Sequence, residues 1–291
     1  MSTVEQRSYA SRGGTRTMAI DVYHPNGQPK AAVLMFHGGG WRRGSREMMA
    51  PPAKVLAANG FIAFGVEYRL LGEAAWPAHI QDVRSALRWV HAHAGEFGFP
   101  ADRIVLQGFS AGGHLALMAA GQPQHAGFDY EGEPTTTPQI AAVVAFYPPT
   151  EFSVEKPRAP GVMRPDTLLG EGADQAAAQR ASPTAYVSKS WPPTLLIHGN
   201  ADQLVPQDAS LRMYAKLREA GAPVEMHLIA GQAHGFLSVP SLVPQVQQQV
   251  INFLERTVVD PAGHAAECLK FNRFVQEDAE RAAAKASAAA G

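Results

Sequence analysis

The chain has 291 residues, of which 46% are hydrophobic and 18% are charged, and its formal net charge is −1. This composition is typical of a globular protein, and the near-neutral charge gives no electrostatic basis for binding nucleic acid or an anionic membrane surface. The single cysteine, Cys268, excludes an intrachain disulfide and a cysteine-based metal site.

Targeting and membrane signals are the next features that the sequence can test. The first ten residues contain no apolar core of signal-peptide length. No run approaches the roughly 18 apolar residues that a membrane-spanning helix requires. We therefore expect a soluble, cytoplasmic protein without membrane or nucleic-acid partners.

Strand-like and helix-like segments alternate along most of the chain, after a start (residues 1–15) that we expect to be irregular. Alternating or continuous apolar runs predict strands at 17–23, 31–36, 61–68, 104–107, 140–147, 193–198 and 224–229. Apolar periodicity and breaker residues predict helices at 46–59, 79–94, 111–120, 207–220 and 241–257. This order predicts an α/β fold with a mostly parallel central sheet of about eight strands and helices on both faces.

Three segments do not follow the alternation of strands and helices. One is a long Gly/Pro/Thr loop at 121–138, and the other two are residues 148–192 and the C-terminal end. Residues 148–192 are rich in Pro and Gly, with a weak helical stretch near 173–180, and predict a small lid or insertion over the carboxyl edge of the sheet. Asp260-Pro261 can cap a further helix, followed by an Ala-rich end expected to fray. We therefore expect one domain at 1–258 and a helical C-terminal extension at 259–291, which could mediate self-association into a homo-oligomer.

A serine lies between one predicted strand and the following predicted helix. Residues 108–112 read Gly-Phe-Ser-Ala-Gly, which fits the pattern Gly-x-Ser-x-Gly. In this pattern the serine occupies a strained turn and its hydroxyl is exposed at the top of a sheet. Glycine suits such a turn because a side chain would obstruct the close strand and helix. The pattern alone also fits a structural turn, so the hypothesis that Ser110 is a nucleophile depends on partners elsewhere.

An acid and a base follow two later strands. Asp202 lies just after the predicted strand 193–198, and His234 just after the strand 224–229. Asp202 could instead cap the following helix, although Asp208 is nearer to that helix start, and a lone loop histidine is usually a surface residue. The chain order nucleophile, acid, base is that of known Ser-Asp-His sites on α/β sheets. In such sheets ligands bind beyond the carboxyl ends of the strands, which is where all three residues are predicted to lie.

The chemistry requires all three residue types and an anion-stabilising site. A serine hydroxyl becomes nucleophilic when a base takes its proton, histidine can take and return that proton near neutral pH, and a carboxylate orients the imidazole. The turn His37-Gly-Gly-Gly40 follows a predicted strand and exposes backbone amides. We expect an oxyanion hole formed by the amides of Gly38, Gly39 and Ala111. A phosphate-binding loop is the competing interpretation, but the P-loop lysine is missing.

Several of these motifs together resemble those of the serine α/β-hydrolases. The motifs are the turn 37–41, Tyr68-Arg-Leu70, the elbow 108–115, the segment 192–199 with Asp202, and His234-Gly-Phe236. The chain is similar to the acetylxylan/feruloyl-esterase-like carboxylesterases, which are neighbours of the hormone-sensitive-lipase type. The latter usually have Asp before the nucleophile, where this chain has Phe109.

The resemblance implies a serine carboxylesterase that hydrolyses short-chain or aryl esters through an acyl-enzyme on Ser110. It implies Asp202 as acid and His234 as base, no metal and no cofactor, and a small-molecule ester as substrate. We expect Trp41, Tyr68 and Phe109 to contact that substrate. The alternatives are an arylformamidase-like amidase acting on substrates such as N-formylkynurenine, and a catalytically silent hydrolase fold used as a binding module.

Overall fold

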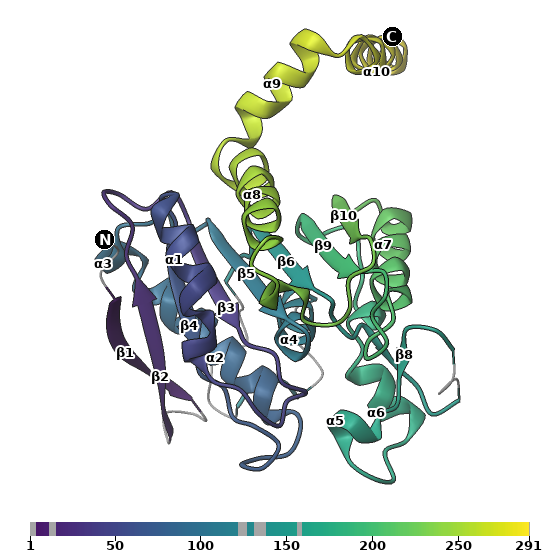
Figure 1. Cartoon of the computed structure of the whole chain (residues 1–291). Coiled ribbons are helices and arrows are strands. Elements are labelled where there is room, and N and C mark those ends of the chain that lie inside the picture. The colour runs from purple at the N-terminus through teal and green to yellow at the C-terminus, as the bar shows by residue number, and fades with distance from the viewer. Residues whose placement is uncertain (1–3, 12–15, 122–126, 131–137, 156–158, 291) are drawn as a thin grey trace.

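An eight-stranded sheet forms the centre of the protein, in the order β1-β2-β4-β3-β5-β6-β9-β10 (Figure 1). A computed structural model describes residues 4–11, 16–121, 127–130, 138–155 and 159–290. β1 and β2 are antiparallel to their neighbours, and the strands from β4 to β10 run parallel. The predicted α/β-hydrolase arrangement of about eight mostly parallel strands is therefore confirmed.

The bounds of the elements follow the predicted order closely. The strands of the main sheet are β1 (Val4–Ser11), β2 (Arg16–Tyr23), β3 (Ala32–Phe36), β4 (Ile62–Val66), β5 (Ile104–Phe109), β6 (Ala142–Phe146), β9 (Thr194–Gly199) and β10 (Val224–Ile229). The helices are α1 (Ala50–Ala58), α2 (Ala78–Ala92), α3 (Ala94–Phe97), α4 (Ala111–Ala120), α5 (Asp166–Leu169), α6 (Gln175–Arg180), α7 (Asp208–Ala220), α8 (Val243–Leu254), α9 (Pro261–Phe271) and α10 (Arg273–Ala290). Most of the predicted loop 121–138 lies outside the described residues.

The expectation that the first residues are irregular is wrong for β1. This edge strand pairs with β2 along its whole length, from Val4 opposite Tyr23 to Ser11 opposite Arg16. Only Tyr9 and Ser11 of β1 are buried, and its exposed positions are Val4, Gln6, Ser8 and Ala10. An edge strand with one solvent-exposed face carries few apolar residues from which it could be predicted. Cross-strand hydrogen bonds, and not burial, supply most of its contacts.

The two faces of the sheet are covered by different helices. In β3, Leu34 and Phe36 pack in the core under α2, α4 and α7, whereas Val33 and Met35 pack under α1 and α8. The side chains of a strand alternate between faces, so a continuous apolar run is what a doubly covered strand needs. Fully burying each such side chain contributes about 1.5–3 kcal/mol relative to exposure.

Residues 148–192 form an insertion with local structure of its own. It contains the two-stranded sheet β7 (Glu151–Phe152) and β8 (Val162–Met163), the helices α5 and α6, and a 3-10 turn at Pro183–Ala185. The predicted helical stretch near 173–180 is α6. Pro149, Met163 and Thr167 line the same cleft as Ser110 and His234, so the insertion forms part of the wall of that cleft; its role as a lid stays a prediction.

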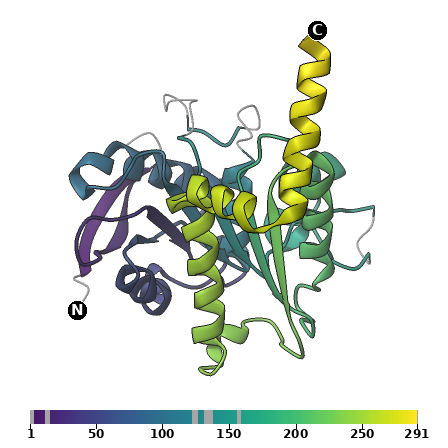
Figure 2. The same ribbon diagram turned by 90° about the horizontal axis from the view of Figure 1, so that it is seen from above.

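The C-terminal helices lead away from the rest of the protein (Figures 1 and 2). A π-helical turn (Glu255–Val259) follows α8, and α9 packs mainly against this turn and α10. The single predicted helix is instead two, because Asn272 is extended, with φ −107° and ψ 104°. The Ala-rich end, expected to fray, is helical to Ala290. The domain boundary near residue 258 stays a prediction.

Among the helices of the described ranges, none combines the length and the apolar character needed to cross a bilayer.

A buried histidine predicts how stability responds to acid. His114 of α4 is fully buried between Trp41, Trp76 and Phe152, and burial lowers the pKa of its imidazole to about 4. Its ring Nε2 donates to the carbonyl of Ala181 at 2.8 Å, which suits the neutral form. The unfolded chain, with an imidazole pKa near 6.5, binds the proton more readily. The contribution of neutral His114 to the free energy of unfolding is therefore fully present above about pH 6.5, and it is lost as the pH drops towards 4.

We expect His114→Gln to reduce this acid sensitivity by up to about 3 kcal/mol between pH 6.5 and 4. Urea unfolding at pH 7, 6, 5 and 4 measures the effect. The amide of glutamine can still donate to Ala181, so the comparison isolates the titration. His79, whose pKa burial also lowers to about 4, remains in both proteins. Equal pH slopes for the variant and the wild type would contradict the assignment.

Candidate active site

Ser110 occupies a tight turn between β5 and α4. Its backbone has φ 53° and ψ −116°, a left-handed conformation that costs a non-glycine residue of the order of 1–3 kcal/mol. The two glycines of the elbow allow the turn: a Cβ on Gly108 would lie 2.1 Å from the carbonyl oxygen of Gly112, and a Cβ on Gly112 would lie 2.1 Å from that of Phe36. The elbow is held by a hydrogen bond from the amide of Ser110 to the carbonyl of Phe146, at 2.9 Å.

The three side chains predicted to act together form one hydrogen-bonded chain. Ser110 Oγ lies 2.9 Å from His234 Nε2, and His234 Nδ1 lies 2.6 Å from Asp202 Oδ2. A carboxylate only accepts hydrogen bonds, so Nδ1 carries the proton and Nε2 is free to accept the proton of Ser110. This is the arrangement that a general base for a serine nucleophile needs.

The carboxylate of Asp202 is buried and completely engaged. Its Oδ1 accepts hydrogen bonds from the amides of Leu204 and Val205, each at 2.9 Å. Its Oδ2 faces His234 and, at 3.3 Å, Nε2 of His198. Burial by itself would raise the pKa of this carboxyl, but the hydrogen bonds from His198, His234 and Val205 outweigh it and hold the pKa well below the ordinary range. Asp202 therefore stays ionised next to the imidazole.

His198 also takes part in the site. Its ring is completely buried at the end of β9. Nε2 donates to the carbonyl of Val205 at 2.8 Å, and Nδ1 accepts from the hydroxyl of Ser210 at 2.7 Å. These bonds fix the ring and the loop that carries Asp202. The sequence does not show these contacts, because they form only when the loop 202–205 folds back onto the end of β9.

The glycine-rich turn after β3 lies directly beside Ser110. A Cβ on Gly38 would lie 3.3 Å from Cβ of Ser110, and Gly39 has φ +120°. The amides of Gly38 and Gly39 donate no hydrogen bond to any described residue, and Ala111 is the first residue of α4, where a helix supplies no acceptor. The three amides predicted for the oxyanion hole are thus available to a ligand.

Tyr68 supports this turn from behind instead of contacting substrate, which corrects the prediction. Its ring is buried, stacks on His37 with the centroids 4.3 Å apart, and is not part of the cleft wall. Its hydroxyl donates to the carbonyl of His37 at 2.7 Å, and the amide of Leu71 donates to that of Trp41 at 2.8 Å. The segment 68–71 therefore holds both ends of the turn 37–41, which carries amides predicted to form the oxyanion hole and is here called the oxyanion turn.

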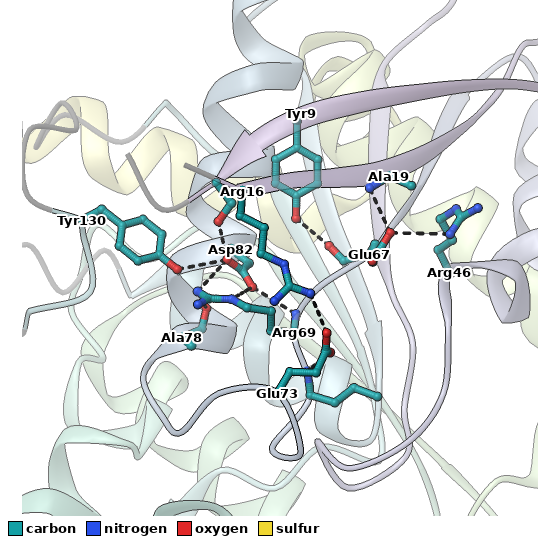
Figure 3. A network of polar contacts seen from close by, with 12 residues as sticks. Tyr9, Arg16, Ala19, Arg46, Glu67, Arg69, Glu73, Ala78, Asp82 and Tyr130 are labelled. Carbon is teal, nitrogen blue, oxygen red and sulfur yellow. Dashed lines mark hydrogen bonds and ion pairs between the residues drawn. The ribbon is translucent and has the colours of Figure 1, made fainter. Parts of the chain in front are cut away.

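A buried ion pair anchors that supporting segment (Figure 3). The guanidinium of Arg69 binds both carboxylate oxygens of Asp82 of α2, with Nε–Oδ2 at 2.7 Å and Nη2–Oδ1 at 2.8 Å. The amide of Arg69 donates to the same carboxylate at 3.0 Å, and the hydroxyls of Tyr130 and Ser11 complete its shell. A bidentate pair fixes orientation as well as distance, so it ties the oxyanion turn to α2 and β1.

A cleft of about 1350 Å³ opens above the serine. Ser110 and His234 lie in its wall together with Trp41 and Phe109, two of the three residues expected to contact substrate. Tyr147, which the sequence did not single out, also lines it, and its ring packs edge-on against His234 at 4.7 Å between centroids. Its position directly after β6 could have indicated a place in the site, because β6 ends beside the end of β5, which leads to Ser110.

No cluster of three or more His, Cys, Asp or Glu side chains within the described residues has metal-binding geometry.

Fold and site together define the protein as a serine α/β-hydrolase. A family model matches residues 20–217, and the chain belongs to that family, BD-FAE. It is 31% identical to "Esterase LipC" of Mycobacterium tuberculosis over 77% of this chain and 58% of LipC. It is 34% identical to "Probable carboxylic ester hydrolase LipM" of the same organism over 64% of this chain and 44% of LipM. The chain thus spans about half the length of these relatives.

Solved structures share the fold over most of this chain. Native esterase 2 of Thermogutta terrifontis superposes with a TM-score of 0.76 and 27% identity, over 89% of this chain and 95% of that one. The C-terminal helices α9 and α10 lie beyond the residues that the family model matches.

The geometry predicts a specific effect of removing one charge from the triad. In Asp202→Asn, the amide oxygen can still accept from Leu204 and Val205, which places the NH₂ group towards His234. That group favours the imidazole tautomer with the proton on Nε2, which cannot accept from Ser110. We expect kcat to fall by about 10³–10⁴-fold with little loss of fold, as for the same change in other triads. Steady-state kinetics and circular dichroism measure the two effects.

Asp208→Asn is the matched control, because Asp208 lies on the same connection but begins α7. It should keep wild-type kcat. A small effect of Asp202→Asn, or an equal effect of both variants, would remove Asp202 from the proposed role.

Proposed function

We propose that the protein is a serine carboxylesterase that hydrolyses carboxylic esters through an acyl-enzyme on Ser110. The observation that supports this best is the continuous chain Ser110–His234–Asp202, at 2.9 and 2.6 Å, next to three amides without an acceptor. The names of the relatives LipC and LipM, and of the similar solved structures, are those of esterases.

In the proposed reaction, Ser110 Oγ attacks the ester carbonyl while His234 Nε2 takes its proton. The amides of Gly38, Gly39 and Ala111 stabilise the tetrahedral oxyanion. His234 then protonates the leaving alcohol as the carbon–oxygen bond breaks, and an acyl-enzyme remains. Water, deprotonated by His234, attacks that acyl group, and the carboxylic acid leaves as the proton returns to Ser110.

We place the substrate among the short-chain or aryl esters of the acetylxylan/feruloyl-esterase-like branch. Membership of BD-FAE and Phe109 before the nucleophile support this branch. The wall of the cleft is rich in Met, Pro and aromatic side chains, which suits an aryl group. A small-molecule substrate, which the family resemblance implies, and a cytoplasmic location remain parts of the same proposal.

An organophosphate tests the nucleophile directly. One similar solved structure is titled esterase 2 of Thermogutta terrifontis phosphorylated by paraoxon, with 25% identity and a TM-score of 0.76. We expect paraoxon to add one diethylphosphoryl group to the wild type and to stop hydrolysis of p-nitrophenyl acetate in proportion. Ser110→Ala should take up no label and lose turnover. Intact-mass spectrometry and absorbance assays measure both, and turnover retained in Ser110→Ala would refute the proposal.

A substrate panel separates the esterase from the amidase alternative. We expect kcat/KM for p-nitrophenyl acetate and methyl ferulate to exceed that for N-formylkynurenine by at least about tenfold, measured on the same preparation. Cleavage of an amide depends more on protonation of the leaving nitrogen than cleavage of an ester depends on protonation of the leaving alkoxide. A preference for N-formylkynurenine would identify an arylformamidase-like enzyme. The absence of turnover on all three would favour a binding module.

A further inference from the structure

Three arginines lie in the wall of the cleft above Ser110. They are Arg42, Arg43 and Arg164. Among the described residues that line the cleft, the one carboxylate is that of Asp166, and it pairs with Arg164 at 2.7 Å. The side chains of Arg42 and Arg43 are exposed and form no ion pair or hydrogen bond with any described residue. Two positively charged residues that no described residue neutralises therefore border the cleft.

Both arginines lie on the turn that carries the oxyanion amides. The amides of Arg42 and Arg43 each donate to the carbonyl of Gly39 at 3.2 Å. The turn is tight: a Cβ on Gly39 would lie 2.0 Å from the carbonyl oxygen of Arg43, and one on Gly44 would lie 2.4 Å from His37 Nδ1. The backbone that presents the two guanidiniums is thus fixed relative to the place where an ester carbonyl would bind.

The nearest acidic residue in the chain does not neutralise these charges. Glu47 follows them in the sequence, but it pairs with Arg46 at 3.0 Å and is not part of the cleft wall. Arg46 itself turns away from the cleft to Asp21, at 3.0 Å. The positive charge at the cleft is therefore available to a ligand.

Much of the remaining wall is apolar, including Met48, Pro51, Val55, Leu204 and Val243. A ligand that matches both parts has an apolar body and an anionic end. Guanidinium groups bind carboxylates through paired, directed hydrogen bonds, and keep their charge at all relevant pH values. An arginine without a partner on a fixed backbone turn is well suited to select such a ligand.

We propose that the physiological substrate is an ester that bears a free carboxylate, such as a hemi-ester of a dicarboxylic acid, and that Arg42 and Arg43 hold this carboxylate. The inference rests on the proposed esterase function and specifies its substrate class. Arg42 and Arg43 act on substrate selection, and the triad acts on both charged and neutral esters alike.

Matched pairs of esters test the selectivity. On the acyl side, monomethyl succinate, adipate and suberate are compared with the methyl esters of the corresponding monoamides. On the alcohol side, 4-acetoxybenzoate is compared with 4-acetoxybenzamide. Acid release in a pH-stat gives kcat/KM for each. We expect the best anionic ester to exceed its neutral partner by about tenfold at low salt, with the ratio falling as salt screens the guanidiniums.

The double variant Arg42→Gln/Arg43→Gln should lower kcat/KM for the anionic ester about tenfold and change that for the neutral partner less than about twofold. Arg218→Gln is the matched control, because Arg218 is exposed on α7 and does not line the cleft. It should leave both values unchanged. Equal rates on both members of every pair in the wild type, or an unchanged ratio in the double variant, would overturn the proposal.

A binding measurement separates this proposal from the esterase assignment. In Ser110→Ala, calorimetric titration with monomethyl adipate and 4-acetoxybenzoate should show binding that the added Arg42→Gln/Arg43→Gln changes weaken about tenfold. Such a loss without turnover of any ester by the wild type would support the anion site and refute the esterase. Turnover of neutral esters, with no effect of the arginines on rates or binding, would leave the esterase and refute the anion site.

Discussion

The close contact between the start of α4 and the end of β3 is the constraint on which the site depends. A Cβ on Gly112 would lie 2.1 Å from the carbonyl oxygen of Phe36, so the helix can lie against that strand end only because residue 112 is glycine. This contact places the turn after β3 beside Ser110, which lies at the start of the same helix. Ser110 and the amides of Gly38 and Gly39 are thus brought together by one packing contact.

The polar groups around the serine are oriented by the protein before any ligand binds. Asp202 accepts from two amides of its own loop and faces two imidazoles, one of which is held by Val205 and Ser210. Groups that are already aligned need no reorganisation as charge develops, which is how such sites lower a barrier. The rigid hydrogen bonding around Asp202 therefore supports function as much as stability.

The buried pair of Arg69 and Asp82 orients a segment that lies behind the site (Figure 3). Burying two charges costs desolvation free energy that their attraction only partly offsets, so a pair of this kind is weak as a source of stability. Its geometry is specific, however, and it holds the segment 68–71 against the oxyanion turn. Tyr68 therefore acts on the structure of the site from outside the cleft.

Local patterns in the sequence predicted most of the fold. The buried strands and the elbow were visible because a doubly covered strand and a tight turn each demand particular residues in consecutive positions. β1 and the break at Asn272 were not predicted, because backbone pairing with the neighbouring strand β2 and a local change of ψ leave little trace in composition. The sequence also did not predict that Tyr68 lies outside the cleft wall. A motif places a residue near a site but does not say which way its ring points.

The sequence by itself determined the α/β class, the strand-end positions of Ser110, Asp202 and His234, and the glycines that let the backbone turn there. Those are properties of neighbouring residues along one chain. The tertiary structure alone decided that His198 touches Asp202, that Arg69 and Asp82 brace the oxyanion turn, and that Arg42 and Arg43 share the cleft with the serine. His198 and Asp202 are only four residues apart, but the other contacts join segments that are separated in the sequence, and the distances between such segments are set by how the sheet and helices pack.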